Sequence, residues 1–351
     1  MKIGDIPPHE LRERLRGDGV SLRTGPIVTR IRSSLDAVVH GIGLHYAAHE
    51  VAPDDGFADF HVSVDRPRTR RRWFHPQVEF RLDDASPFSP LPGDQGFPML
   101  EWGLNWCVTG LCHQYLSIHA AVIERAGFAM ILPAPSGSGK STLCAGLIHR
   151  GWRLLSDELT LIDPASGRIV PLPRPVSLKN ASIDVIRQFA PEAVFGRAVS
   201  ETTKGTVCHF RPPAEAVARG VESPLPRWVV LPRFVAGSAS TLVPLTRGKA
   251  LMRLIENSFN YNLHGARGFA VLADLVERCE CYEFSYSRLD SAAELFAALA
   301  DGADRTAPDV ARLAASHGGF AGGFNGGFAG GSVPEPPVEP TPLAPTHPPI
   351  E

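Results

Sequence analysis

The sequence predicts an α/β protein built around a phosphate-binding loop. Strand-like apolar runs alternate with segments of helical periodicity along most of the chain, which is typical of α/β folds. One glycine-rich stretch, APSGSGKST (134–142), follows an apolar run and precedes an amphipathic pattern. This order of strand, loop and helix is the context in which such a stretch binds nucleotide phosphates.

Composition limits the classes of protein that need to be considered. The chain has 351 residues, 44% of them hydrophobic and 21% charged, so it can bury a sizeable core in one large domain or two ordinary ones. The net charge of −2 disfavours nucleic acid as a partner. No apolar run reaches the length of a membrane span or of a signal peptide, which predicts a cytoplasmic protein with free thiols and no membrane partner.

Three regions are predicted: residues 1–115, 116–305 and 306–351. The first has three strand-like runs, at 25–31, 57–64 and 75–82, broken by Pro, Asp and Gly and followed by a helix over 99–116. The last is Gly-rich and then Pro-rich, which predicts a disordered tail. Five arginines in RPRTRRRW (66–73) predict a solvated loop. The alternative is that this segment binds an acidic peptide or nucleic acid.

The central region follows the α/β pattern element by element. Two apolar runs joined by a short turn predict adjacent strands, and a helix ending at Gly151 follows the glycine-rich stretch. The predicted strands are 116–124, 127–134, 152–156, 159–163, 168–173, 227–235 and 281–286, and the later predicted helices are 249–260, 268–279 and 289–300.

The glycine-rich stretch has the chemistry of a phosphate cradle. Gly137 and Gly139 allow a backbone tight enough for successive N–H groups to point at phosphate oxygens, at the positive end of the next helix. Lys140 is predicted to reach the β- and γ-phosphates, and the Ser141 hydroxyl to bind Mg²⁺. Ala134 replaces the usual glycine, a difference of one methyl group. The predicted nucleotide-binding residues are Ser136, Gly137, Ser138, Gly139, Lys140, Ser141 and Thr142.

Two adjacent carboxylates, Asp157 and Glu158, lie one predicted helix and one predicted strand beyond Lys140. This spacing places them at the end of a strand near the loop, close to the terminal phosphate. The chain has neither the LSGGQ-like signature of transporter ATPases nor the NKxD motif of GTPases. The carboxylates therefore favour phosphoryl transfer, with Asp157 as a candidate base and Glu158 as a candidate Mg²⁺ ligand. Spacing alone leaves the division of roles open.

The segment SIHAAVIERAGFAMILPAPSGSGKSTLCAGLIHRGWRLLSDELTLID (117–163) resembles the core of HPr kinase/phosphorylase. PLPRPVSLKN (171–180) and TKGTVCHFRPP (203–213) are similar to the subgroup called HprK-related kinase A, so that the resemblance covers residues 115–300. The family's acidic pair is Asp-Asp where this chain has Asp157-Glu158, and its Gly-rich C-terminal signature is not found. The resemblance therefore does not imply that this chain has the phosphorylase activity, or that HPr itself is its substrate.

The resemblance implies a P-loop kinase core of the HPr kinase and phosphoenolpyruvate carboxykinase-like type. It implies an ATP- and Mg²⁺-dependent serine kinase that acts on a peptide or protein and forms a homo-oligomer. His119 matches the family's histidine before the loop, as a third catalytic candidate beside Lys140 and Asp157. A small-molecule kinase and a non-catalytic ATP-sensing module remain alternatives. Further candidate phosphate contacts in the matched blocks are Arg174, Lys179, Lys204 and His209.

Overall fold

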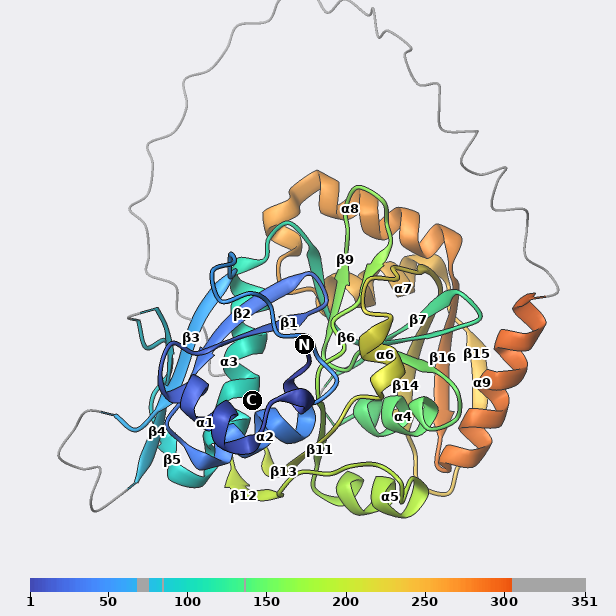
Figure 1. Cartoon of the computed structure of the whole chain (residues 1–351). Helices are drawn as coiled ribbons and strands as arrows, with labels where there is room; N and C mark the ends of the chain where they lie inside the picture. The colour runs from blue at the N-terminus through green and yellow to red at the C-terminus, as the bar shows by residue number, and fades with distance from the viewer. Residues whose placement is uncertain (68–75, 84, 136, 305–351) are drawn as a thin grey trace, which may run out of the picture. The chain divides into compact units, whose positions relative to one another are not determined.

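The computed structural model describes residues 1–67, 76–83, 85–135 and 137–304, and Met1–Ala300 forms one compact unit (Figure 1). Its described residues form a mixed α/β structure with three sheets, which agrees with the predicted α/β class. The predicted tail, most of the arginine-rich segment and Ser136 lie outside the described residues. In the part of the chain that the structure describes, no helix is long and apolar enough to cross a bilayer.

The N-terminal region is a five-stranded sheet packed against helices. Its strands follow the order β1–β2–β3–β4–β5, and the three strands that the sequence predicts correspond to β2, β3 and β4. Their apolar side chains share a core with Leu159, Leu161 and Leu172 of the following region, so the two regions bury apolar surface together. The elements are η1 (Ile3–Asp5), α1 (Pro8–Arg16), β1 (Val20–Thr24), β2 (Ile27–Arg32), α2 (Asp36–His45), β3 (Phe60–Asp65), β4 (Gln77–Leu82), β5 (Leu91–Pro92), η3 (Gly93–Gln95) and α3 (Gly96–Leu111).

Helix α3 differs from its predicted bounds. The sequence predicts a helix over 99–116, but α3 ends at Leu111 and the next strand begins at Leu116. Leu116 pairs with Ile162 in the central sheet, and strand pairing there replaces a further helical turn. The helix packs along β3 and β4 (Figure 1), and its buried face joins the N-terminal core.

The central sheet has eight strands in the order β10–β9–β6–β7–β14–β16–β15, with β8 paired to β6. β6 and β7, which the sequence predicts as adjacent strands, form an antiparallel hairpin, and β7, β14 and β16 run parallel. All seven strands predicted in the central region are present as β6, β7, β8, β9, β10, β14 and β16. The bounds are β6 (Leu116–Arg125), β7 (Phe128–Pro133), β8 (Arg153–Ser156), β9 (Leu159–Ile162), β10 (Ile169–Val170), β14 (Leu225–Phe234), β15 (Thr241–Pro244) and β16 (Glu280–Tyr286).

Helices flank this sheet. α7 and α8 share a buried cluster with side chains of β6, β7 and β14, whereas α4 contacts β6, β8 and β14 through buried residues outside that cluster. The predicted helices 249–260 and 268–279 correspond to α7 and α8, and α7 begins and ends earlier than predicted. In α8 the non-helical backbone of Gly265, with φ 53°, separates the first turn from the predicted part. The bounds are α4 (Lys140–Ile148), α5 (Ala181–Phe189), α6 (Ala214–Ala218), α7 (Arg247–Glu256), α8 (Tyr261–Arg278) and α9 (Leu289–Asp304).

A small antiparallel sheet in the order β11–β13–β12 completes the unit. Its strands are β11 (Val176–Lys179), β12 (Val199–Thr202) and β13 (Gly205–Phe210). The sequence predicts no strands in these three segments. Two of the three have only four residues, and a pattern of that length is too short to identify a strand by its periodicity.

Strand register brings the glycine-rich turn and the carboxylates to one place. Ala120 and Ala121 on β6 pair with Pro133 and Leu132 at the end of β7. On the other side of β6, β8 ends opposite Val122 and β9 begins opposite His119. The link between β8 and β9, which contains Asp157 and Glu158, therefore passes beside the same two alanines.

Candidate functional site

The glycine-rich turn joins the end of β7 to the start of α4. Gly137 and Gly139 have φ of 83° and 90°, a left-handed backbone that side chains disfavour. Ala134 is buried at the end of the strand, where a methyl group is accommodated. α4 starts directly at Lys140, so its first free N–H groups face the turn and favour an anion there.

Two neighbouring strands hold the turn in position. The backbone N–H of Phe234, at the end of β14, donates a hydrogen bond to the Ser138 carbonyl at 3.0 Å. The hydroxyl of Tyr286, at the end of β16, donates to the Gly139 carbonyl at 2.9 Å. A Cβ atom on Gly139 would lie 2.6 Å from that hydroxyl, so both the contact and the backbone conformation require glycine.

Lys140 carries a buried ammonium group without a hydrogen-bond partner. Its side chain is 6% exposed, and among the described residues no acceptor lies within hydrogen-bonding distance of Nζ. Burial lowers the pKa of Lys140, and the negative charges of Asp157 and Glu158 oppose that shift. The Ser138 hydroxyl is also buried, and no residue that the structure describes bonds to it. Because unpaired buried donors are costly, these two groups fit an anionic ligand held in the turn.

Asp157 directly follows β8 and is 5% exposed. The backbone N–H of Ser177 donates to Oδ2 at 3.3 Å, whereas Oδ1 has no partner among the described residues. Burial and the adjacent Glu158 raise the pKa of Asp157 to about 6, although Lys140 opposes the shift. Ser141 lies close enough to lower this pKa through its hydroxyl. Asp157 therefore reaches the first turn of α4 with one carboxylate oxygen free.

Glu158 is engaged on both oxygens. Oε1 lies 3.6 Å from Nζ of Lys179, and Oε2 accepts a hydrogen bond from the Asn105 side-chain amide. Burial alone would raise the pKa of Glu158, but the surrounding cations, chiefly Lys179 and Lys204, lower it to about 2. The two adjacent carboxyl groups thus differ in charge state below pH 6, because Glu158 stays ionised while Asp157 takes up a proton.

His119 lies on β6 opposite Leu159, the residue that follows Glu158. Burial and the nearby charge of Lys140 lower the pKa of His119 to about 4, against the effect of Glu158. Its imidazole is therefore neutral at physiological pH. The ring also contacts Phe259, with a centroid distance of 5.9 Å. The structure thus brings His119, Lys140 and the carboxylates within electrostatic range of one another.

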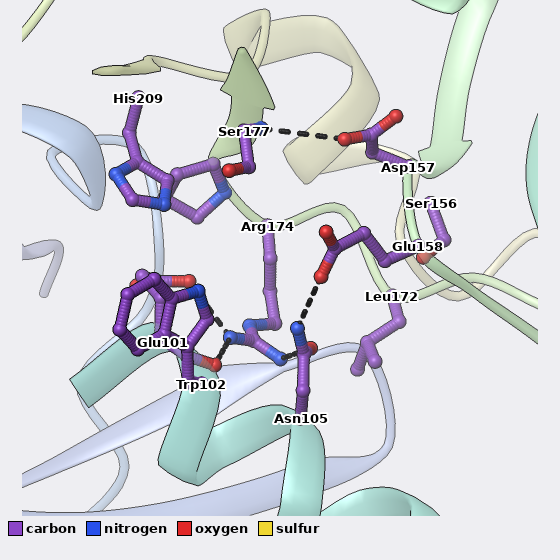
Figure 2. Close-up of a pocket in the computed structure, with 11 residues that line it drawn as sticks. Glu101, Trp102, Asn105, Ser156, Asp157, Glu158, Leu172, Arg174, Ser177 and His209 are labelled. Carbon is purple, nitrogen blue, oxygen red and sulfur yellow. Dashed lines mark hydrogen bonds and ion pairs between the residues drawn. The ribbon is translucent and has the colours of Figure 1, made fainter. Parts of the chain in front are cut away.

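Helix α3 of the N-terminal region supplies the opposite wall of a small cleft beside the carboxylates. Figure 2 shows Glu158 pointing across this cleft toward Asn105, with Arg174 between the walls. The cleft has a volume of about 20 Å³, which suits one water-sized group. Three α3 residues line the cleft: Glu101, Trp102 and Asn105. They could not be predicted as site residues from the sequence, because only tertiary packing brings them to the carboxylates.

Arg174 is buried, and its guanidinium group bonds to other side chains of the protein. Its Nη2 lies 2.7 Å from Oε2 of Glu101, and its Nη1 donates to Oδ1 of Asn105 at 2.7 Å. Glu101 also accepts a hydrogen bond from the Tyr46 hydroxyl at 2.7 Å. Arg174 therefore bonds to two residues of α3, Glu101 and Asn105, and Asn105 contacts Glu158 directly. These contacts occupy the guanidinium, unlike the free phosphate clamp that the sequence suggests.

The other three candidate phosphate contacts come from the small sheet. Lys179 ends β11 beside Glu158, and Lys204, in the turn between β12 and β13, lies 5.9 Å from the Trp102 ring centroid. Burial lowers the pKa of Lys204, and Glu158 opposes this shift. His209 is buried in the cleft wall, and burial lowers its pKa to about 4. The two lysines are thus near the carboxylates, while the neutral His209 supports the wall.

The residues present fit Mg²⁺ bound together with phosphate, and do not fit a metal cage made of protein alone. Among the described residues, no group of three or more His, Cys, Asp or Glu side chains could hold a metal ion. Mg²⁺ usually keeps several waters and takes one or two protein ligands plus substrate phosphates. Ser141 and the unpartnered Oδ1 of Asp157 are oxygen donors of that kind, and Glu158 could join them if it released Lys179.

Comparison with known proteins gives a similarity over a short stretch of the chain. No protein-family model matches the chain. A stretch of 43 residues is 44% identical to part of a protein from Fusobacterium nucleatum subsp. nucleatum that is provisionally named HPr kinase/phosphorylase. The match covers 12% of this chain and 7% of the length of that relative. It supports a relation over this stretch without establishing family membership, so the activity of this chain is a matter for proposal.

Proposed function

We propose that this protein is an ATP- and Mg²⁺-dependent kinase with an HPr-kinase-like P-loop core, which transfers the γ-phosphate to a hydroxyl group, that of serine in a peptide or protein. The observation that carries the proposal is the buried ammonium of Lys140, which has no partner within the described residues. It lies at the start of α4, after a turn with two positive-φ glycines, and within the field of the buried Asp157 and the partly buried Glu158.

Nucleotide binding in the proposed kinase depends on charge. Lys140 would bind the β- and γ-phosphates, while the backbone N–H groups of the turn surround the phosphate oxygens. Ser141 and Glu158 would hold Mg²⁺, which neutralises charge on the phosphates when bound. Lys179 lies 3.6 Å from Glu158 and is placed to exchange that contact for a phosphate oxygen.

Phosphate transfer in the proposed kinase depends on Asp157 as the base. A base works best when its pKa is near the operating pH, and that of Asp157 is raised to about 6. Its Oδ1 is unpaired among the described residues and can accept the proton of the acceptor hydroxyl. The backbone N–H of Ser177 fixes the other oxygen. The neutral His119 adds a hydrogen-bonding group to the same site without adding charge.

A small-molecule kinase on the same core, and a sensor that binds ATP without transferring phosphate, are the competing functions. The free oxygen and raised pKa of Asp157 favour chemistry, because a sensor has no use for a base beside the phosphates. The acceptor must be found by experiment.

The test uses γ-labelled ATP with serine-containing peptides in one set and small hydroxyl compounds in another. We expect label in peptides from the wild type and none from Lys140→Ala, which should also lose MgATP affinity in calorimetry. Lys249→Ala, which removes an exposed lysine from α7, is the matched control and should retain both activities. Label only in small compounds would select the second function, and ATP binding without transfer would select the sensor. Unchanged ATP affinity in Lys140→Ala would contradict the binding site itself.

A further inference from the structure

We infer that a purine base stacks on Phe234, on the opposite side of the glycine-rich turn from the carboxylates. The inference rests on the proposed function, because it takes the phosphates to lie in the turn. The proposed function names the residues that bind the phosphates. The inference adds where the base lies and that it is a purine.

The strand directions in the central sheet determine on which side of the glycine-rich turn the base would lie. β7 and β8 are both antiparallel to β6, so they run in the same direction and end at the same edge. β14 and β16 are parallel to β7 in the same sheet and end there too. The carboxylates follow β8 on one side of the turn, and Phe234 ends β14 on the other. Three strand spacings, about 14 Å, separate β8 from β14, which leaves room for an extended nucleoside triphosphate.

Phe234 has the properties of a stacking platform. The residue is 51% exposed although it adjoins the turn, where its backbone N–H bonds to Ser138 at 3.0 Å. Its ring is held against Tyr286 at a centroid distance of 5.8 Å and an interplanar angle of 78°. Tyr286 in turn stacks on Phe284 at 5.4 Å. An exposed aromatic ring is thus fixed against the same tyrosine that bonds to Gly139.

The surroundings of Phe234 indicate how a base would be recognised. Val235, which follows it, is also partly exposed, at 37%. The hydroxyls of Ser238 and Ser240, in the loop after β14, are buried without partners among the described residues. Stacking depends on ring area and tolerates differences between bases. We therefore expect ATP and GTP to bind with similar affinity, and CTP more weakly.

The experiment compares ATP with inorganic tripolyphosphate, which has the phosphates and no base, both with Mg²⁺ in calorimetry. Phe234→Ala should weaken ATP binding by roughly 5- to 100-fold, the usual effect of losing one base–aromatic stack, and leave tripolyphosphate binding unchanged. Phe234→Trp should retain ATP affinity, and its added fluorescence should change with ATP and not with tripolyphosphate. Phe269→Ala, which removes a ring of 50% exposure from α8, is the control and should bind as wild type does.

Each other outcome overturns the inference in its own way. Equal losses for ATP and tripolyphosphate in Phe234→Ala would mean that the side chain only supports the turn. Unchanged ATP affinity would mean that the base lies elsewhere. If the wild type binds tripolyphosphate through Lys140 but shows no gain from the base, the proposed function survives and the platform does not. If Lys140→Ala changes neither ligand, the phosphate site fails, and the platform with it.

Discussion

Arg174 and Glu101 form a buried ion pair, with Nη2 of the arginine 2.7 Å from Oε2 of the glutamate. Glu101 lies on α3 of the N-terminal region, and Arg174 lies in the segment that leads into β11. Asn105 extends the contact to Glu158, since its amide accepts from Arg174 and donates to the carboxylate. The N-terminal region therefore contacts the carboxylate pair through Asn105, whose amide is held in place by Arg174.

Removing one partner of this pair should destabilise the protein strongly. Arg174→Met leaves Glu101 buried without its cation, which typically costs about 3–5 kcal/mol. Chemical denaturation measures the loss. The double variant Arg174→Met with Glu101→Leu should recover most of the stability, because no uncompensated charge remains. Equal stability of the single and double variants would show that Arg174 contributes through packing alone.

Gly139→Ala should abolish nucleotide binding while leaving the fold intact. The new methyl group meets the Tyr286 hydroxyl at 2.6 Å, at a φ of 90° that alanine disfavours. Gly137→Ala has a similar φ of 83° but open space around its Cβ, and should lose less affinity. Calorimetric titration with MgATP ranks the two. A larger loss in Gly137→Ala would contradict the role assigned to the contact with Tyr286.

The pH dependence of the transfer reaction should identify the base. Below its pKa of about 6, Asp157 is protonated and cannot accept the hydroxyl proton, so kcat/KM should fall as pH decreases through 6. His119, with a pKa near 4, and Glu158, with a pKa near 2, do not change charge in that range. Initial rates from pH 5 to 8 measure the profile. The same acid limb in Asp157→Asn would assign it to another group.

The stability of the nucleotide-free protein should also depend on Asp157. Its pKa is raised from 3.8 to about 6 on folding, so the folded state binds the proton more tightly than the unfolded state does. The contribution of Asp157 to stability is therefore most favourable below pH 4 and is lost as pH rises through 6. Asp157→Asn should melt at a higher temperature than wild type at pH 7.5, and this gain should shrink toward pH 4. A gain that is constant with pH would contradict the pKa shift.

The sequence predicts the central region better than the rest. The β6–β7 hairpin, α4, β8 and β9 follow from apolar runs, turns and helical spacing, and the register beside Ala120 explains why Lys140 and Asp157 meet. Trp102 and Asn105 could not be predicted as site residues, since α3 reaches the cleft only through packing between regions. The sequence places Phe234 in a strand, but only the end of β14 beside the turn reveals its exposed ring. The predicted boundary at residue 115 and the predicted tail remain predictions.

One measurement distinguishes a base from a metal ligand at Asp157. It compares phosphate transfer from γ-labelled ATP by wild type and by Asp157→Asn over a range of Mg²⁺ concentrations. The asparagine keeps the shape of the site but cannot accept a proton, so the proposed base predicts nearly unchanged ATP affinity and a transfer rate lower by roughly 10²–10⁴-fold at every Mg²⁺ concentration. Recovery of the rate with excess Mg²⁺ would instead make Asp157 a metal ligand. Wild-type transfer by Asp157→Asn at ordinary Mg²⁺ would contradict the catalytic assignment and the preference for a kinase over a sensor.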